Sequence, residues 1–404
     1  MDKRKVLVIG REVSDFLCPL FRQVNEDGAF EVHLLETRKV SRKQSDIDAS
    51  FEKQHRVNTS LQDYSKGDLL KAAFSGTFLE SIFRGKSAKD GLRDALVEKQ
   101  LKHLFRRFDV FNIQFLTAEV VYLAGFIPDG KKIVLSFWGS DLFQCNEDFR
   151  HDHHQALIER ANTVVLHSPE MKVIFLSKFG WHLEHKVKTF LMADMHQALL
   201  PVYEQLPSKG AARERFRKKL GVEDSHMVIT IGHSGHDIDN HETIVGALAN
   251  LPASIKEKCF FVFPMTYGAE PGYIDLVEDA CRKAGLRFAI LKEFLSQEDM
   301  VGLRFVADIL VRLSRFDAFS LSLCETLCAG NVVISGTWLP YGILRASGIY
   351  FREISEVKQV AAVLPEVIGN LDSYRVRCQD NPGKVMQLFS QMRPATQLSN
   401  VFAT

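Results

Sequence analysis

The chain has 404 residues, which is too long for one ordinary hydrophobic core and predicts two domains of roughly 150–200 residues each. Its hydrophobic fraction of 46%, charged fraction of 25% and net charge of +1 are those of a globular protein. With a net charge this close to zero, the overall charge gives no reason to expect nucleic acid as the partner.

The cysteines and the N-terminus indicate the compartment. Seven scattered cysteines form no CxxC pair, which favours a reduced setting over a disulfide framework. The start MDKRKVLVIG has too few apolar residues for a signal peptide, and no run reaches the roughly 18 apolar residues that span a bilayer. We expect a cytoplasmic protein, soluble or at most peripheral at the inner face of the membrane.

Short apolar runs alternate with helical stretches in the first half of the chain. Such runs predict the strands of a parallel sheet covered on both faces. The helix after the last run has Ser168 as its N-cap and Pro169 at its first position. The predicted strands are residues 5–10, 30–36, 110–116, 132–139 and 163–168.

The pattern restarts after residues 199–212, which carry two prolines and a glycine. A second series of strands and helices follows, so the sequence predicts two consecutive α/β domains joined near residues 200–210. A cleft between two such domains is the usual ligand site. The strands of the second series are residues 226–232, 259–265, 287–294, 307–314 and 331–336.

Common nucleotide and metal motifs are absent or weak. The first strand ends in a single Gly10 without GxGxxG, and no GxxxxGK[ST] loop occurs. The Asp-x-Asp pairs at 46–48 and 237–239 match a metal-binding pattern so short that it arises by chance. We therefore expect no metal site.

Two acids in the second domain carry the strongest signal. Asp317 and Glu325 are separated by seven residues, and Glu325 lies on a short predicted helix that Gly330 closes before the next strand. This resembles the E-x7-E element of glycosyltransferases with the GT-B fold, two facing Rossmann-like α/β domains, notably family 4. The first acid is Asp rather than Glu, a departure from that element. The resemblance implies that Glu325 binds the ribose and Asp317 lies by the transferred sugar; the alternative is that Glu325 pairs with a neighbouring Arg or a helix N-terminus.

Three further stretches point the same way. A Gly/Ser loop within residues 229–248 precedes a helix whose amides can cradle a diphosphate. That stretch and residues 261–286 resemble bacterial 4-acetamido-4,6-dideoxygalactose transferases, and residues 290–315 have a shape common to many GT-B enzymes. In the predicted first domain, residues 136–143 also resemble the loop that faces the sugar in related transferases. The implied nucleotide-sugar contacts are Gly232, His233, Ser234, Gly235, Tyr267, Phe294, Phe319, Ser320, Leu321 and Glu325.

The chemistry of sugar transfer requires positive groups at the leaving diphosphate. Family 4 enzymes usually place an Arg and a Lys after the first strand of this domain, where this chain has histidines. Arg315 is our candidate for holding the leaving diphosphate. The alternative is that Arg315 is an ordinary surface arginine beside Asp317. Asp141 is the candidate for contacting the sugar or activating the acceptor, with an N-cap as its alternative. With Asp317, these two form the predicted catalytic set.

A basic stretch bears on the acceptor. Residues 84–107 carry eight Lys or Arg against three acids, with apolar side chains interleaved. One interpretation is a peripheral contact of residues 83–107 with anionic lipid. The other is an amphipathic helix packed over the core.

These resemblances imply a metal-independent hexosyltransferase-like glycosyltransferase with no cofactor. It would use a nucleotide-sugar donor and a glycan or lipid-linked acceptor in bacterial surface polysaccharide or glycolipid assembly. The alternatives are a GT-B epimerase or a silent nucleotide-sugar-binding subunit. The sugar, base, acceptor, stereochemistry and oligomeric state stay open. The predicted domains are residues 1–205 (acceptor), 206–380 (nucleotide-sugar) and 381–404, a helix that crosses back to the N-terminal domain.

Overall fold

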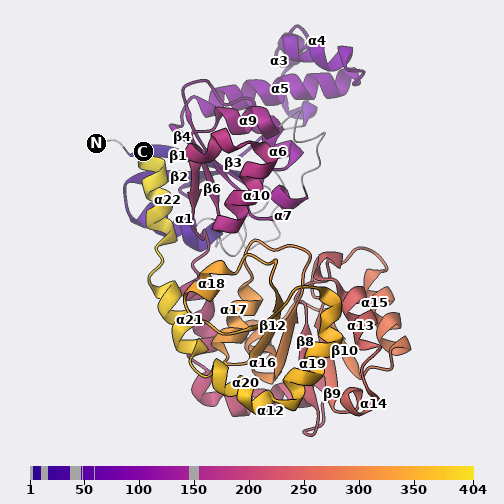
Figure 1. The fold of residues 1–404 in the computed structure, drawn as a ribbon. Helices are drawn as coiled ribbons and strands as arrows, with labels where there is room; N and C mark the ends of the chain where they lie inside the picture. The colour runs from indigo at the N-terminus through magenta and orange to yellow at the C-terminus, as the bar shows by residue number, and fades with distance from the viewer. Residues whose placement is uncertain (1–2, 11–16, 37–46, 48, 59, 145–153) are drawn as a thin grey trace. The chain divides into compact units, whose positions relative to one another are not determined.

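The protein is described by a computed structural model that covers residues 3–10, 17–36, 47, 49–58, 60–144 and 154–404. The chain divides into two compact units, residues 1–194 with 393–404 and residues 195–392. Each unit is built around its own parallel sheet (Figure 1). Among the described residues, no helix combines the length and the apolar character that crossing a bilayer requires.

The first unit has a seven-stranded sheet in the order β3-β2-β1-β4-β5-β6-β7. Val6 of β1 lies opposite Val32 on one side and Val110 on the other, and all three are fully buried. The strands are β1 (Arg4–Gly10), β2 (Phe30–Glu36), β3 (Lys53–Arg56), β4 (Val110–Gln114), β5 (Lys132–Ser136), β6 (Thr163–Leu166) and β7 (Val187–Thr189).

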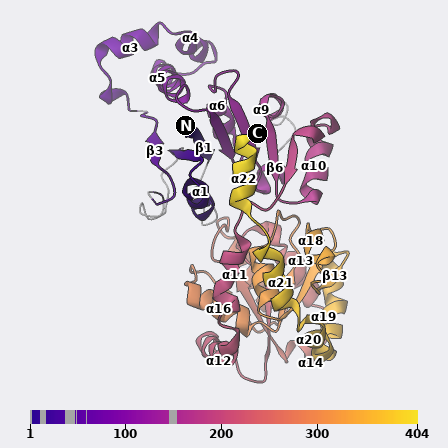
Figure 2. The same ribbon diagram turned by 90° about the vertical axis from the view of Figure 1, so that its left-hand side faces the viewer.

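The helices of the first unit include three that follow one another between β3 and β4. Of these, α3 and α4 pack on α5 (Figure 2), and the end of α5 reaches the sheet, where the rings of Phe105 and Phe111 lie 5.0 Å apart. The elements are α1 (Leu17–Glu26), η1 (Leu61–Asp63), α3 (Lys66–Ala73), α4 (Gly76–Phe83), α5 (Ala88–Phe105), α6 (Ala118–Ala124), α7 (Ser140–Phe143), α9 (Gln155–Arg160), α10 (Pro169–Phe179), η3 (Trp181–Lys186) and α22 (Pro394–Ala403).

The second unit has a six-stranded sheet in the order β10-β9-β8-β11-β12-β13. Its strands are β8 (Met227–Ile231), β9 (Cys259–Pro264), β10 (Phe288–Leu291), β11 (Ile309–Arg312), β12 (Val332–Gly336) and β13 (Arg352–Ile354). Its helices are α11 (Met195–Tyr203), η4 (Leu206–Ser208), α12 (Lys209–Leu220), η5 (Asp237–Asp239), α13 (His241–Leu248), α14 (Ala253–Lys256), α15 (Tyr273–Lys283), α16 (Gln297–Val306), α17 (Leu321–Cys328), α18 (Gly342–Ala346), η6 (Val357–Gln359), α19 (Val360–Gly369), α20 (Leu371–Cys378) and α21 (Asn381–Ser390).

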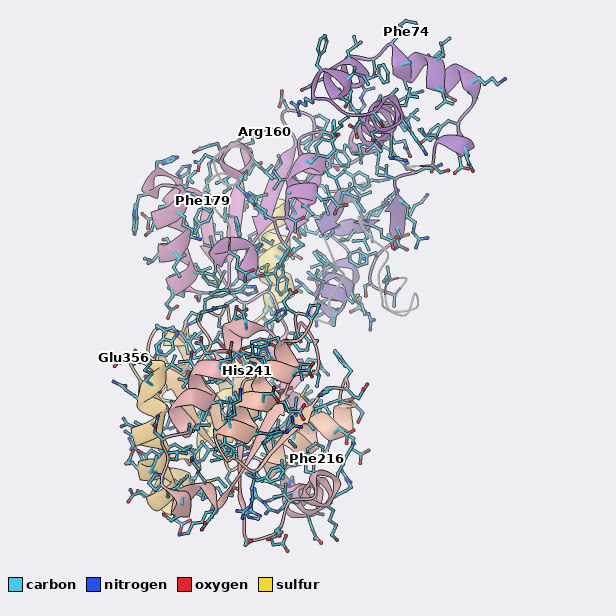
Figure 3. The ribbon with its side chains drawn as sticks, turned by 90° about the vertical axis from the view of Figure 1, so that its right-hand side faces the viewer. Phe74, Arg160, Phe179, Phe216, His241 and Glu356 are labelled. Atoms are coloured by element: carbon cyan, nitrogen blue, oxygen red, sulfur yellow. The ribbon has the colours of Figure 1, made fainter. Side chains whose placement is uncertain are left out.

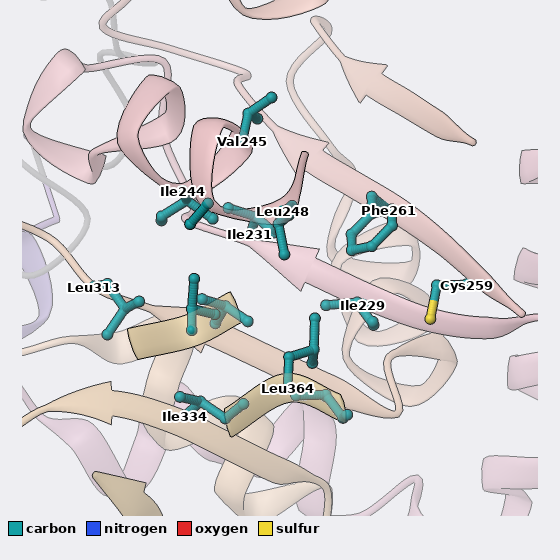
Figure 4. Close-up of a cluster of buried hydrophobic side chains, with 14 of the residues drawn as sticks. Ile229, Ile231, Ile244, Val245, Leu248, Cys259, Phe261, Leu313, Ile334 and Leu364 are labelled. Atoms are coloured by element: carbon teal, nitrogen blue, oxygen red, sulfur yellow. The ribbon is translucent and has the colours of Figure 1, made fainter. Parts of the chain in front are cut away.

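The core of the second unit is formed between its sheet and the helices on one face (Figure 4). Ile229 and Ile231 of β8 are fully buried and pack with Leu248 of α13 and Leu364 of α19. Every second residue of the strand faces this cluster, as the period of a β-strand requires. The apolar runs in the sequence therefore form the inner face of a covered sheet.

All ten predicted strands are present, most with shorter ends, and the predicted α/β class is confirmed. The predicted cap of α10 is also confirmed, since the Ser168 side chain accepts from the amide of Met171. Three strands, β3, β7 and β13, were missed. They lie at sheet edges, have three or four residues and are largely polar, so they carry no apolar run.

The C-terminal segment is two helices rather than one. The stripe of Val385 and Phe389 belongs to α21, which contacts α11 and α17 in the second unit. The residues that belong to the first unit are those of α22, which begins at Pro394 and packs on α1. The units divide at 194/195 and 392/393, against predicted boundaries at 205/206 and 380/381.

Candidate functional site

A polar network lies at the carboxyl ends of β8 and β11 in the second unit, and the carboxylate of Asp239 is its centre. Oδ2 of Asp239 accepts from the Ser234 hydroxyl at 2.8 Å and from the Ser234 amide at 3.1 Å. Oδ1 accepts from the Ser314 hydroxyl at 2.5 Å and from the guanidinium of Arg312. Asp239 therefore ties the loop after β8 to the residues after β11.

Arg312, the last residue of β11, joins two carboxylates. Its Nη1 donates to Asp239, and its Nη2 donates to Oδ2 of Asp317 at 2.8 Å. The Tyr341 hydroxyl donates to the same oxygen of Asp317, also at 2.8 Å. Arg312 and Tyr341 are buried, so Asp317 is held in one place by two buried donors.

The pKa values in this network follow from burial and from mutual charge. Burial works to raise the pKa of Asp239, but the charge of Arg312 and hydrogen bonds from His233 and Ser314 hold it well below its usual range. Burial works to lower the pKa of Arg312, and the charges of Asp239 and Asp317 raise it well above the usual value. Asp239 and Arg312 therefore form an ionised carboxylate–guanidinium pair around neutral pH.

The amides of the Gly/Ser loop point into the protein. His233 and Ser234 donate to Asp239, Gly232 donates to the Val311 carbonyl at 3.1 Å, and Gly235 donates to the Tyr267 carbonyl at 2.7 Å. The expected cradle of free amides for a diphosphate is not present in the described loop. Asp239, seven residues beyond Gly232, occupies the position of the anion that such amides would bind.

Two glycines of this loop are required by its geometry. Gly232 has a φ of +68°, and a Cβ there would lie 2.8 Å from Nε2 of His241. A Cβ on Gly235 would lie 2.7 Å from the Cβ of Ala269. The loop is thus packed against its neighbours at both glycines.

His241, labelled in Figure 3, is the first residue of α13 and is fully buried. Its Nε2 has no hydrogen-bond partner among the described residues, and its Nδ1 lies 3.4 Å from the Tyr273 hydroxyl. Burial, partly opposed by the charge of Asp239, lowers the pKa of His241 to about 4. His241 is therefore neutral at physiological pH.

Aromatic side chains lie beyond the ends of β9 and β10. The ring of Tyr267 is 6.0 Å from that of His233, 6.1 Å from that of His236 and 6.3 Å from that of Phe294. Tyr267 is 44% exposed and Phe294 is 77% exposed. The structure thus brings the predicted residues Tyr267, Phe294 and His233 to one edge of the sheet, where they present flat apolar surfaces to solvent.

Glu325 is buried within α17, and its partner is an arginine. Nε of Arg304, on α16, donates to Oε2 of Glu325 at 2.9 Å. Oε1 accepts no hydrogen bond from the described residues. Of the two interpretations made from the sequence, the structure shows the pairing with a neighbouring Arg.

The start of α17 holds the other predicted contacts. The Ser320 hydroxyl accepts from the Leu323 amide at 3.2 Å and caps the helix. Phe319 packs edge-on against Tyr341 and Phe389. Leu321 is half-buried. At the other end Gly330 has a φ of +72°, as its predicted role of closing the helix requires.

Arg315 is exposed, and Arg312 is the buried arginine of this region. Nη2 of Arg315 donates to Asp237 at 2.6 Å, and both side chains are more than half exposed. Arg312 was not among the predicted site residues, although alternation along β11 indicates it, because Ile309 and Val311 face the core cluster and Arg312 lies on the other face. Asp239, Ser314 and Tyr341 were missed as well.

Asp141 belongs to the first unit, where it braces a loop. Its Oδ1 accepts from the amides of Trp138 and Gly139, both at 2.9 Å, and its Oδ2 accepts from the amide of Leu116 at 3.0 Å. Burial raises the pKa of Asp141 to about 6 against the opposing effect of these amides. Two of the three donors, Trp138 and Gly139, lie three and two residues before it, so the carboxylate closes the turn after β5 rather than capping the helix that follows.

No group of three His, Cys, Asp or Glu side chains suited to a metal occurs in the described part of the chain. Asp237 and Asp239 of the second Asp-x-Asp pair bind Arg315 and Arg312 instead. The outer residues of the first pair, at 46 and 48, lie outside the described residues. The six described cysteines are free and buried.

Comparison with known proteins gives the class of the fold. No family model and no curated protein matches the sequence. Among solved structures, a glycosyltransferase from Rickettsia africae has a TM-score of 0.69 at 14% identity, over 100% of this chain and 98% of that chain. Anabaena HepE in complex with UDP and glucose has a TM-score of 0.68 at 14% identity, over 99% of each chain. WaaG, a glycosyltransferase involved in lipopolysaccharide biosynthesis, has 0.61 at 14%, over 98% of this chain and 99% of that chain. The chain has the GT-B fold predicted from its sequence.

Proposed function

We propose that this protein is a glycosyltransferase that moves a sugar from a nucleotide-sugar donor to a glycan or lipid-linked acceptor, in bacterial surface polysaccharide or glycolipid assembly. The observation that carries the proposal is the Asp239–Arg312–Asp317 network at the carboxyl ends of β8 and β11 of a GT-B unit. Open parallel sheets bind their ligands at that edge. HepE, a neighbour in fold, has been solved with UDP-glucose.

The donor nucleotide is assigned to the second unit. Tyr267 and Phe294 offer exposed aromatic faces on which a base can stack. Oε1 of Glu325, which accepts nothing from the described residues, is the acceptor assigned to a ribose hydroxyl. Arg304 holds that carboxylate in place through Oε2. In this assignment the ion pair and the ribose contact use different oxygens of one side chain.

The leaving diphosphate needs cationic or N–H donors as negative charge develops on it. Because the amides of the Gly/Ser loop are engaged, we assign this role to side chains. Arg315 is exposed and pairs only at the surface with Asp237, so an incoming phosphate can replace that partner. His233 is partly exposed and its ring contacts Asp239 of the network. No step in this assignment requires a metal.

The two carboxylates of the predicted catalytic set have different positions. Asp317 is fixed by Arg312 and Tyr341 next to the start of α17, which suits a group that positions the transferred sugar. Asp141 already accepts three amides, so we assign it to shaping the loop of residues 136–143 rather than to proton transfer. We also propose that the protein is related to family 4 and to the acetamido-sugar transferases.

A thermal-shift screen over nucleoside diphosphates and their sugars tests the donor, because a ligand that binds the folded state raises the melting temperature. We expect one nucleotide class to raise it, and Tyr267→Ala to remove the shift while Val376→Ala, at an exposed position outside the site, retains it. With the donor identified, release of nucleotide only when an acceptor is added shows transfer. Release of an epimer, or binding without turnover, would replace the proposal with an epimerase or a silent subunit.

A further inference from the structure

Two short helices of the first unit, α3 and α4, carry several large apolar side chains on the outside. Phe83 is 90% exposed and Phe74 is 81% exposed, and Phe74 lies at the outer edge of the helices in Figure 3. The remaining members of this group are Leu70, Leu79 and Ile82. We call these five residues the α3–α4 face.

The spacing of these residues makes them two stripes rather than scattered exposures. Leu79, Ile82 and Phe83 are three and four residues apart on α4, which places them on one side of that helix. Leu70 and Phe74 are four apart on α3 and its C-cap. Isolated exposed apolar residues are ordinary, but contiguous ones on a soluble surface mark an interaction site.

The opposite sides of the same helices already pack within the unit. Ala72 of α3 is buried, and Phe78 of α4 lies 3.0 Å from the position of a Cβ on Gly91 of α5. The Ser81 hydroxyl is also buried and donates to Asp94 of α5 at 2.8 Å. The α3–α4 face is therefore not the side that the fold needs for its own core.

Basic residues flank the α3–α4 face. Phe83 is followed by Arg84, Lys86 and Lys89, all exposed. Over residues 61–107 there are ten Lys or Arg against six Asp or Glu. Five of the basic side chains have no acidic partner among the described residues: Lys66, Lys71, Lys89, Arg106 and Arg107.

Exposed phenylalanines beside unpaired lysines and arginines match an anionic bilayer surface, where rings enter the headgroup region and cations meet lipid phosphates. We propose that the α3–α4 face docks on an anionic lipid membrane. A protein partner that buried these rings would also have to supply acids for the surrounding cations. The bilayer supplies both an apolar layer and negative charge.

The α3–α4 face lies mostly before residues 83–107, the stretch for which the sequence left open a lipid contact or a helix packed over the core. Within residues 83–107, the side chains of Leu96, Leu101 and Phe105 are buried, so α5 is the helix packed over the core. Only Phe83 of the interleaved apolar residues is exposed, and the rest of the face lies before it in the chain.

Flotation with vesicles tests the proposal on the full-length protein. We expect binding to equal parts phosphatidylglycerol and phosphatidylcholine, weak binding to phosphatidylcholine alone, and loss of binding as salt rises. Phe74→Ser/Phe83→Ser should lower the partition coefficient about tenfold or more. Lys71→Gln/Lys89→Gln should weaken binding to the anionic vesicles alone. Trp181→Ser, an exposed aromatic of the same unit outside these helices, is the matched control and should bind as the unmodified protein does.

A second readout does not depend on flotation. Phe83→Trp should shift its fluorescence to shorter wavelengths when anionic vesicles are added. Absence of binding to anionic vesicles, or unchanged binding by Phe74→Ser/Phe83→Ser, would overturn the proposal. A different result would also overturn it: light scattering shows a dimer, the double substitution dissociates that dimer, and vesicles have no effect. A second copy of the chain would then cover the face. Neither measurement contains a sugar donor, so the outcome is independent of the proposed transfer.

Discussion

Nε of Arg304 donates to Oε2 of Glu325 at 2.9 Å, and the two side chains are 5% and 6% exposed. The pair joins α16 to α17, and it places a full negative charge inside a helix of which seven of eight residues are buried. A buried carboxylate at this depth requires a charged partner. Arg304 thus allows the acid to lie next to the site without destabilising the unit.

The first prediction concerns this pair. Arg304→Met should lower the free energy of unfolding by about 3–5 kcal/mol, because it leaves Glu325 buried and uncompensated. Arg304→Met/Glu325→Leu should recover most of that loss, since two apolar side chains of similar size replace the two charges. Urea unfolding followed by circular dichroism measures both. A single variant as stable as the unmodified protein would show that Glu325 is solvated in solution.

The second prediction separates the structural role of Glu325 from its proposed role in binding. Glu325→Gln keeps the size of the side chain and an acceptor for Arg304, but removes the charge that a ribose hydroxyl would meet. We expect nucleotide affinity to fall about tenfold or more, because hydrogen bonds to charged groups contribute about 1.5–3 kcal/mol. Calorimetric titration with the nucleotide identified by thermal shift measures the change.

The control for that titration is Glu353→Gln, at a residue of the same unit that pairs with Arg345 near the surface. It should bind nucleotide as the unmodified protein does. Equal affinity of Glu325→Gln and the control, with Glu325→Gln still folded, would remove Glu325 from the binding site.

Much of this region was predictable because its signals are local. The position of α17 follows from Ser320 at its start and Gly330 after its end, both read from neighbouring residues. The partner of Glu325 was not predictable, since Arg304 lies 21 residues away on another helix and only packing brings the two together. The sequence allowed an Arg or a helix N-terminus, and no local signal chooses between them.

The polar network shows a second reason why the site could not be predicted fully from the sequence. A Gly/Ser loop between a strand and a helix predicts free amides, and nothing in Gly232 to Gly235 shows that Asp239 turns back beneath them. The same pair of acids, Asp237 and Asp239, matched a metal motif. Its members instead meet arginines that lie more than 70 residues further along the chain.

The third prediction is a loss of stability in acid. Burial lowers the pKa of His241 to about 4, against about 6.5 in the unfolded chain. Between these values the unfolded state binds more protons, so stability falls as the pH is lowered from about 6.5 to 4. The shift corresponds to roughly 3 kcal/mol for this group.

Urea midpoints at several pH values in that window measure the effect. His241→Gln should flatten the pH dependence, because it removes the group that must be protonated. His236→Gln, at an exposed residue of the same loop, should leave the slope as it was. Parallel slopes for the two variants would mean that other groups cause the acid sensitivity.

The fourth prediction is that turnover needs no divalent metal. Asp237 and Asp239 are engaged with arginines, and no suitable group of ligands occurs in the described part of the chain. EDTA should therefore leave the rate of nucleotide release unchanged once a donor and an acceptor are known. A rate abolished by EDTA and restored by Mn²⁺ would contradict this prediction and would make the Asp-x-Asp pair at 46–48 the candidate metal site.

The fifth prediction concerns α22, the last helix of the chain. Leu398 and Phe402 are fully buried in the core of the first unit, and the ring of Phe402 meets that of Phe30 edge-on at 5.6 Å. Nη1 of Arg4 also donates to the Ala403 carbonyl at 3.0 Å. Because α22 packs on α1, its loss uncovers one side of the sheet that carries β1 and β2. Phe402→Ala alone should lower the free energy of unfolding of the first unit by about 3–5 kcal/mol, whereas Gln397→Ala, at an exposed position of the same helix, should change it little.

Hydrogen exchange locates the effect of removing whole helices. Deletion of residues 394–404 should raise exchange in α1, β1 and β2 and leave α17 protected, because α21 still packs on α17 in the second unit. Deletion of residues 384–404 removes most of α21 as well and should raise exchange in both units. If the shorter deletion raises exchange in α17 as strongly as in α1, the final helix does not belong to the first unit in solution. Unchanged exchange in α1 after either deletion would contradict the packing of Leu398 and Phe402.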